Sequence, residues 1–202
     1  MTKKFSINSD YNSFKEAFLE ENAKHNLISK NDENFLYEKH FYDSLSIKLF
    51  LEKYSFNPQK ILDIGCGGGF PCVPIAIEYP EFKIIGVDSI RKKINSVKEI
   101  AEKLNLSNLN PIWERVENLE ENDFDLVVSR AVADMTKISE YALPKLKKGG
   151  YFVAYKSKKA LEEIDFAKNV LKKYKSEVVD IIDYKLPLEE NYERYLVCVK
   201  KL

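Results

Sequence analysis

The residues of this 202-residue chain with the clearest chemical meaning are a cluster of glycines and an acid that follows it. Four of the seven glycines lie between positions 65 and 69, after a short apolar run at 61–64, and Asp88 ends a second apolar run at 83–87. Glycine permits a tight turn with positive φ and close approach of the backbone to a ligand, while an acid after the next strand suits ribose hydroxyls. The pattern predicts a nucleotide-cofactor site, and the alternative is a glycine-rich loop without a ligand.

The spacing of these glycines distinguishes between two candidate cofactors. A dinucleotide site needs the pattern GxGxxG, but Phe70 stands at the third glycine position, where its ring would obstruct the packing of helix on strand. Asp63 completes the string DIGCGGG, which resembles the DxGxGxG signature of class I methyltransferases that use S-adenosylmethionine. The Asp63 carboxylate could face the cationic amino-acid end of that cofactor or structural waters. The sequence therefore favours S-adenosyl-L-methionine over NAD.

Arginine is scarce in this chain, with four among the 32 Lys and Arg residues. Each arginine is thus a candidate for a place where a planar guanidinium with several donors is needed, and a surface salt bridge is the alternative. Arg115 and Arg130 each follow a predicted strand. Because ligands of open α/β sheets bind beyond the carboxyl ends of the strands, both arginines are candidate site residues.

Strands and helices alternate from Lys60 onward, which is typical of a mostly parallel sheet. Only a short connection separates the last two strands, so we expect them to pair as an antiparallel hairpin. The predicted fold class is α/β: a class I S-adenosylmethionine-dependent methyltransferase (Rossmann-like) fold with a mostly parallel seven-stranded sheet and a terminal antiparallel hairpin. Sequence patterns predict strands at 61–64, 83–87, 110–113, 124–129, 151–155, 177–183 and 194–199, and helices at 72–78, 91–104, 136–146 and 160–173.

The segment before this alternation has a different character. Residues 1–57 contain no glycine or proline, and apolar residues such as Phe14 and Phe18 are spaced as in helices. We expect an N-terminal helical lead-in at 1–57 packed on the same domain, and a methyltransferase core at 58–202.

Composition and charge narrow the class of protein. With 45% hydrophobic and 32% charged residues, the chain has the profile of a soluble globular domain. The formal net charge is zero, so contacts with nucleic acid must come from local patches. Three scattered cysteines predict neither a disulfide framework nor a metal site, and no apolar stretch is long enough for a signal core or a membrane span. We expect a cytoplasmic monomer with no metal and no membrane contact.

The segment after the fourth predicted strand bears on the methyl acceptor. It reads SRAVADM, without the Asn/Asp-Pro-Pro-aromatic motif used on exocyclic amines and without a cysteine for pyrimidine C5. An acceptor that needs neither deprotonation nor covalent activation fits this segment, and guanine N7 is such an atom because its lone pair is exposed at the base edge. Catalysis then consists of positioning and electrostatics, and no catalytic base is assigned.

Several strings in a fixed order resemble the glucose-inhibited division protein B (GidB/RsmG) family, the bacterial 16S rRNA (guanine-N7)-methyltransferases, over residues 24–200. The strings are HFYDSL, DIGCGGGFPCVPIAI, VDSIRKK, ERVENL, LVVSRAVA and ERYLVCVK. The resemblance implies transfer of a methyl group from S-adenosylmethionine to N7 of the 530-loop guanosine, on the small ribosomal subunit or a late precursor. It implies cofactor contacts from Gly65, Phe70, Asp88, Val116, Glu117 and Arg130.

The resemblance also implies roles for residues outside the cofactor turn. Arg115, Lys156, Arg194 and His40 are expected to bind the RNA substrate or, with Asp43, to hold the N-terminal helices over the site. For His40, a satisfied structural histidine is an equally good interpretation.

Two other functions stay open on the sequence. Zero net charge and the lack of a recognisable RNA-binding appendage fit a small-molecule methyltransferase with the same cofactor. The generic character of a βαβ glycine turn fits a non-catalytic nucleotide-binding module or a dinucleotide enzyme. The identity of the methyl acceptor distinguishes the first alternative, and binding of NAD rather than S-adenosylhomocysteine distinguishes the second.

Overall fold

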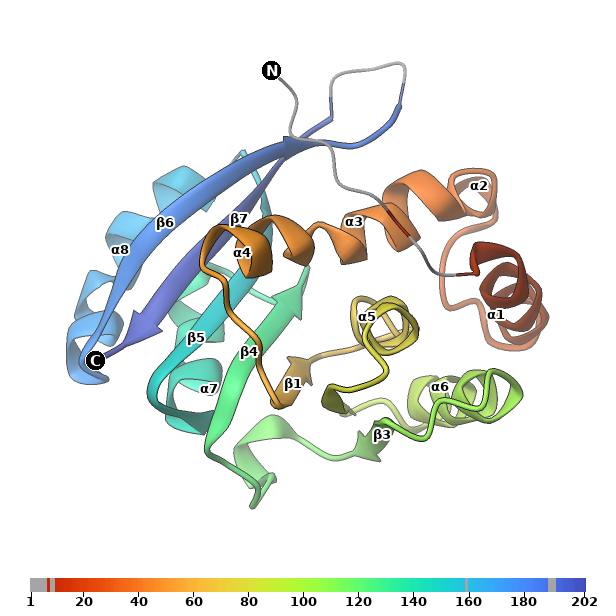
Figure 1. The fold of residues 1–202 in the computed structure, drawn as a ribbon, viewed down its shortest axis with the longest axis horizontal. Helices are drawn as coiled ribbons and strands as arrows, with labels where there is room; N and C mark the ends of the chain where they lie inside the picture. The colour runs from red at the N-terminus through yellow and green to blue at the C-terminus, as the bar shows by residue number, and fades with distance from the viewer. Residues whose placement is uncertain (1–6, 8–9, 159, 189–191) are drawn as a thin grey trace.

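The computed structural model of the chain describes residues 7, 10–158, 160–188 and 192–202. Its centre is a seven-stranded sheet in the order β3-β2-β1-β4-β5-β7-β6, with helices on both faces (Figure 1). The predicted fold class is confirmed, and each strand overlaps its predicted range. The strands are β1 (Lys60–Ile64), β2 (Lys83–Asp88), β3 (Leu109–Trp113), β4 (Phe124–Arg130), β5 (Leu146–Ser157), β6 (Ser176–Lys185) and β7 (Glu193–Lys201).

Strand β1 lies between β2 and β4 and pairs with both in parallel. Ile61 of β1 is level with Ile84 on one side and with Leu126 on the other, and all three side chains are buried. Continuous apolar runs of this kind are typical of parallel strands that helices cover on both faces. Because parallel neighbours end at the same edge of a sheet, the residues that follow β1, β2 and β4 come together there.

The last two strands form the antiparallel end of the sheet, since β7 pairs antiparallel with both β5 and β6. Strand β5 begins before its predicted start at residue 151, because Leu146 already pairs with Phe124 of β4. The register between these strands shifts just after that pair, and Gly149 has a φ of +80°. A glycine at positive φ allows a strand to bulge without ending, which the sequence prediction missed.

Helices α7 (Met135–Lys145) and α8 (Ala160–Lys173) cover one face of the sheet, and α5 (Cys72–Glu78) and α6 (Arg91–Lys103) cover the other (Figure 1). Helix α6 shows why these segments are helical, because its buried residues Ile94, Val97 and Ile100 recur at intervals of three. Their spacing places one apolar stripe against the sheet.

The N-terminal segment packs onto the α5 and α6 side of the molecule. Asp10 begins α1 by accepting hydrogen bonds from the backbone N–H groups of Asn12 and Ser13. The rings of Phe14 and Phe18 are fully buried in the same apolar cluster as the side chains of β1 and α5. Residues 1–6 and 8–9 of the predicted lead-in lie outside the described residues. The elements are α1 (Tyr11–His25), α2 (Lys30–Glu33), the π-helix η1 (Leu36–Tyr42), α3 (Asp43–Leu45) and α4 (Ile47–Lys53).

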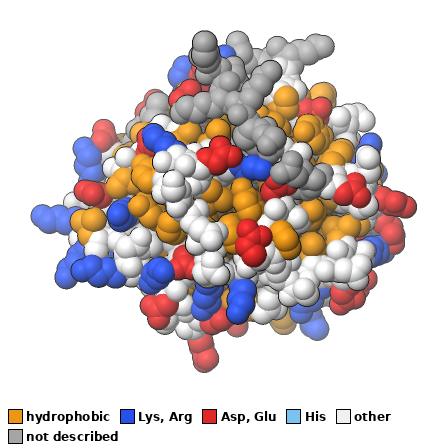
Figure 2. Space-filling model, viewed as in Figure 1, with side chains coloured by type: hydrophobic (Ala, Val, Ile, Leu, Met, Phe, Trp, Pro, Cys, Tyr) orange, Lys and Arg blue, Asp and Glu red, His pale blue; other side chains and the backbone are white. Residues whose placement is uncertain are grey.

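The surface carries both signs of charge, in line with the formal net charge of zero. On the face shown in Figure 2, basic and acidic side chains both lie around the edge, and apolar side chains are visible towards the middle. Among the described residues, no helix is long and apolar enough to cross a membrane. In the same part of the chain, no group of three or more His, Cys, Asp or Glu side chains is arranged to hold a metal ion.

Candidate functional site

A pocket of about 570 Å³ opens where β1, β2, β3 and β4 end. Residues of the glycine turn and of the segments that follow β2, β3 and β4 line it. It lies beyond the carboxyl ends of parallel strands, where open α/β sheets bind their ligands. The lining residues are Leu27, Ile28, His40, Ile64, Gly65, Cys66, Gly67, Gly68, Phe70, Val87, Asp88, Ser89, Ile90, Lys93, Glu114, Arg115, Val116, Glu117, Arg130, Ala131, Val132 and Tyr141.

The glycine turn needs glycine at Gly65 for two separate reasons. Its φ is +69°, a conformation that costs other L-residues about 1–2 kcal/mol. A Cβ at this position would also lie 2.5 Å from Cγ2 of Val132, which is too close for a real contact. The N–H of Gly65 donates to the carbonyl oxygen of Val87 at 2.8 Å, so the turn is fixed to the end of β2.

Asp88 ends β2 with its carboxylate fixed at the rim of the pocket. Oδ2 accepts a hydrogen bond from the backbone N–H of Gly67 at 3.0 Å, and Oδ1 accepts one from the N–H of Ile90 at 2.8 Å. These two bonds connect the glycine turn to the start of α6. Each carboxylate oxygen keeps a further lone pair, so the group can still accept hydrogen bonds from a ligand.

Asp63 takes a position beneath the turn rather than in the pocket. Its side chain is fully buried, and Oδ2 accepts a hydrogen bond from the backbone N–H of Cys72 at 3.0 Å. Burial raises the pKa of Asp63 to about 7. Asp63 is not one of the residues that line the pocket. Its hydrogen bond to Cys72 instead holds the first turn of α5 against β1.

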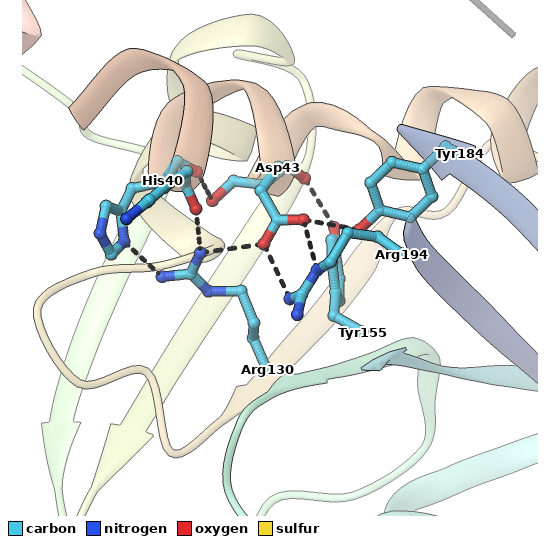
Figure 3. Close-up of polar contacts among 8 residues, drawn as sticks. His40, Asp43, Arg130, Tyr155, Tyr184 and Arg194 are labelled. Carbon is cyan, nitrogen blue, oxygen red and sulfur yellow. Dashed lines mark hydrogen bonds and ion pairs between the residues drawn. The ribbon is translucent and has the colours of Figure 1, made fainter. Parts of the chain in front are cut away.

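Arg130, at the end of β4, connects the pocket to the N-terminal helices (Figure 3). Its Nη1 donates to the carbonyl oxygen of Lys39 and to Oδ2 of Asp43, both at 3.0 Å, and its Nη2 lies 3.0 Å from Nδ1 of His40. The guanidinium carbon also lies 5.0 Å from the ring centroid of Phe70. Arg130 therefore uses several donors and its flat face at once, which a lysine could not do.

Asp43 lies at the start of α3, and its buried carboxylate accepts hydrogen bonds from three side chains. Besides the bond from Arg130, Arg194 of β7 donates to Oδ2 from Nη2 at 3.1 Å, and the hydroxyl of Tyr184 donates to Oδ1 at 2.6 Å. Burial alone would raise the pKa of Asp43, but the charges of Arg194 and Arg130 outweigh it, and the pKa is lowered. The carboxylate is thus held ionised between two guanidinium groups.

His40 lies on the wall formed by η1, with its ring against Phe70 at a centroid separation of 4.9 Å. Burial, and then the positive charge of Arg130, lowers the pKa of His40 to about 4. The imidazole is therefore neutral at ordinary pH.

The structure gathers eight of the ten predicted site residues around this one pocket: Gly65, Phe70, Asp88, Val116, Glu117, Arg130, Arg115 and His40. The other two have internal partners. Lys156 donates to the carbonyl oxygen of Ala133 at 2.6 Å and to Glu163 at 2.8 Å, and Arg194 binds Asp43. Val116 and Glu117 belong to the short 3-10 helix η2 (Val116–Asn118), which follows β3.

Sequence reasoning missed several residues that line the pocket. Lys93 and Ile90 could have been found from their place at the start of the helix that follows Asp88. Leu27 and Tyr141 gave no local signal, because they reach the pocket only through the packing of α1 and α7 onto the sheet.

Comparison with known proteins places this chain in a family. A family model described as rRNA small subunit methyltransferase G (GidB) matches residues 7–191. The chain is 37% identical over 196 residues to ribosomal RNA small subunit methyltransferase G of Listeria welshimeri, covering 95% of this chain and 81% of that protein. It is 39% identical over 192 residues to the protein of that name from Oceanobacillus iheyensis, covering 92% and 79% of the two chains.

Solved structures of lower identity show the same fold. TYW2 of M. jannaschii in complex with AdoMet superposes with a TM-score of 0.59 at 16% identity, covering 79% of this chain and 77% of that chain. An S-adenosylmethionine-dependent O-methyltransferase from Thermotoga maritima gives a TM-score of 0.58 at 18% identity, covering 80% and 65%. The family resemblance predicted from the motifs is confirmed: the chain belongs to the GidB family of ribosomal RNA small subunit methyltransferases G.

Proposed function

We propose that the chain transfers a methyl group from S-adenosylmethionine to N7 of the 530-loop guanosine of 16S rRNA. The observation that carries this proposal is the convergence of the glycine turn, Asp88, the Val116–Glu117 segment and Arg130 on one pocket. Family membership supports methylation of rRNA, and the chemistry of the pocket supports N7 of guanine as the atom that accepts the methyl group.

The residues around the pocket fit the cofactor. A Cβ at Gly65 would fit only if the side chain of Val132 moved, and the fixed carboxylate of Asp88 suits the two hydroxyls of a ribose. We assign Gly65 and Phe70 to the methionine side of the cofactor, and Val116 with Glu117 to the adenine edge. When bound, S-adenosylmethionine supplies an activated methyl group, while the protein supplies position and electrostatics.

N7 of guanine is favoured as acceptor because His40, the histidine that lines the pocket, is not free to act as a general base. The lone pair of His40 Nδ1 faces a donor of Arg130, so this ring cannot readily take a proton from a substrate. Arg115 and Lys93 line the pocket as cations. N7 needs no proton removed, and its methylation requires only that the lone pair point at the methyl group.

We propose that 16S rRNA or the small ribosomal subunit is the partner, that the acting form is a monomer, and that it works in the cytoplasm. Arg115 is exposed at the mouth of the pocket, where it could contact a phosphate. Arg194 and Lys156 support the site by holding Asp43 and the segment after β4, respectively. The N-terminal helices and the sheet act together in this proposal as one methyltransferase domain.

Mapping of N7-methylguanosine in 16S rRNA tests the proposal. Cells that lack the protein should have an unmethylated 530-loop guanosine, and expression of the wild-type chain should restore the methyl group. Small subunits from the deficient cells should then accept labelled methyl groups from the purified protein and S-adenosylmethionine. Methylation of a metabolite but not of these subunits would favour a small-molecule enzyme, and calorimetric binding of NAD but not S-adenosylhomocysteine would rule out the cofactor assignment.

A further inference from the structure

We infer that His40 selects guanine over adenine by donating a hydrogen bond from Nε2–H to O6 of the base whose N7 is methylated. This inference rests on the proposed function and adds to it a residue that recognises the acceptor. Both purines expose a lone pair at N7, so a guanine-specific enzyme needs a group that distinguishes O6 of guanine from the 6-amino group of adenine.

The hydrogen-bond partner of Nδ1 fixes the tautomer of His40. Nη2 of Arg130 lies 3.0 Å from Nδ1, and a guanidinium can only donate. Nδ1 must therefore accept, and the proton of the neutral ring is on Nε2. Arg130 is itself held by hydrogen bonds to Lys39 and Asp43, so its guanidinium fixes the orientation of the imidazole through Nδ1 (Figure 3).

The donor at Nε2 is buried and has no hydrogen-bond partner within the described residues. A buried donor without a partner costs on the order of 1–3 kcal/mol, so such a group calls for an explanation, and a ligand that accepts its hydrogen bond is one. The ring of His40 lies against Phe70, and both residues line the pocket. Nε2 itself is covered in the ligand-free protein, beside the wall where the N-terminal helices meet the cofactor pocket, so the base must displace the side chains that cover it to reach the N–H.

The chemistry of the purine edge matches this donor. Guanine presents O6, an acceptor, beside N7, whereas adenine presents an amino group that donates at the same position. Nε2–H would bind guanine O6 and leave N7 free for the methyl group, but with adenine it would meet another donor. A neutral donor also adds no positive charge beside the sulfonium or beside the cationic purine that forms.

The test compares two variants on two acceptors. His40→Phe keeps a ring against Phe70 but removes the N–H, and His40→Gln keeps an N–H at nearly the same place. Small subunits would be reconstituted with 16S rRNA that carries guanine, or 2-aminopurine, which lacks O6, at the target position. The readouts are kcat and KM for methyl transfer at pH 7.5 and calorimetric affinity for S-adenosylhomocysteine.

We expect 2-aminopurine to lower kcat/KM of the wild-type protein about 10- to 100-fold. His40→Phe should lose a similar factor on guanine and nothing further on 2-aminopurine, and His40→Gln should recover most of the loss. Affinity for S-adenosylhomocysteine should stay within about twofold in both variants.

Three results would overturn the inference: wild-type protein that does not distinguish the two bases, His40→Phe that matches wild type on guanine, or a loss in His40→Phe that is equal on both bases. The first comparison needs no variant and is independent of any folding defect. If the wild-type protein methylates no guanosine in either particle, the proposed function itself fails. If the protein methylates guanine and 2-aminopurine equally well, the proposed function stands and only the role of His40 is lost.

Discussion

Oδ2 of Asp43 lies 3.0 Å from Nη1 of Arg130, and this ion pair joins the N-terminal helices to the ligand edge of the sheet. The carboxylate is buried at 1% exposure of its side chain, and Arg194 shares it. One short helix is therefore fixed to β4 and to β7 through a single acid. The wall of the pocket that carries His40 depends on this arrangement.

Replacing Asp43 with asparagine should destabilise the protein strongly. Asn keeps the shape of the side chain but leaves the guanidinium groups of Arg130 and Arg194 close together without a negative charge. Loss of one partner of a buried ion pair costs about 3–5 kcal/mol, and we expect that decrease in the free energy of unfolding measured with urea. The control is Asp165→Asn, which removes an exposed pair with Lys168 and should cost less than about 1 kcal/mol. Equal effects of the two changes would contradict this account of Asp43.

The stability of the ligand-free protein should respond to pH through Asp63. Its pKa is raised by burial from an ordinary value of 3.8 to about 7, so the folded chain keeps a proton that the unfolded chain has lost between these values. The contribution of Asp63 to stability is fully present below about pH 4 and is lost as pH rises through 7. Asp63→Asn cannot ionise, so it should gain up to about 4 kcal/mol relative to wild type between pH 4 and pH 8. Urea denaturation at several pH values measures this difference, and parallel curves for the two proteins would show that Asp63 ionises normally in the fold.

Gly65→Ala should impair the pocket more than a change at another glycine of similar backbone conformation. At Gly149, φ is +80° and no atom lies within 4 Å of an added Cβ, so Gly149→Ala adds only conformational strain of about 1–2 kcal/mol. At Gly65 the same strain is joined by a contact of 2.5 Å with Val132. We expect Gly65→Ala to lower affinity for S-adenosylhomocysteine at least about tenfold and Gly149→Ala to leave it unchanged. Similar calorimetric affinities for the two variants would argue against a ligand at this turn.

Arg130→Lys should reduce methyl transfer by at least about tenfold, although the positive charge remains. A lysine cannot bond Lys39, Asp43 and His40 together while covering the ring of Phe70. Lys158→Ala serves as the control, because the Lys158 side chain is 79% exposed and its ammonium lies 3.9 Å from the carboxylate of Glu193. Initial rates on small subunits that lack the methyl group measure both variants. Comparable rates would mean that the several donors of Arg130 are not needed.

The sequence by itself determined the fold class and which residues lie around the pocket that we propose binds the cofactor. Apolar runs, the glycine turn and Asp88 are local patterns, and local patterns identify strands, turns and their order. Once the strands are parallel and adjacent, their carboxyl ends must lie together, so the residues that follow β1, β2 and β4 could be assigned to one site. The early start of β5 escaped prediction because the predicted helix runs to residue 146 and the predicted strand begins only at residue 151, whereas Gly149 lets the strand bulge and continue through this segment.

Only the tertiary structure decided how the side chains act. Asp43 meets Arg130 across 87 positions of the sequence and Arg194 across 151, and no local periodicity specifies such partners. The tautomer of His40 follows from one of these contacts, and the position of Asp63 beneath the turn, instead of facing the pocket, follows from the packing of α5 on β1. Burial and hydrogen-bond partners set the charge and the available donors of a side chain, and both are properties of the packed molecule.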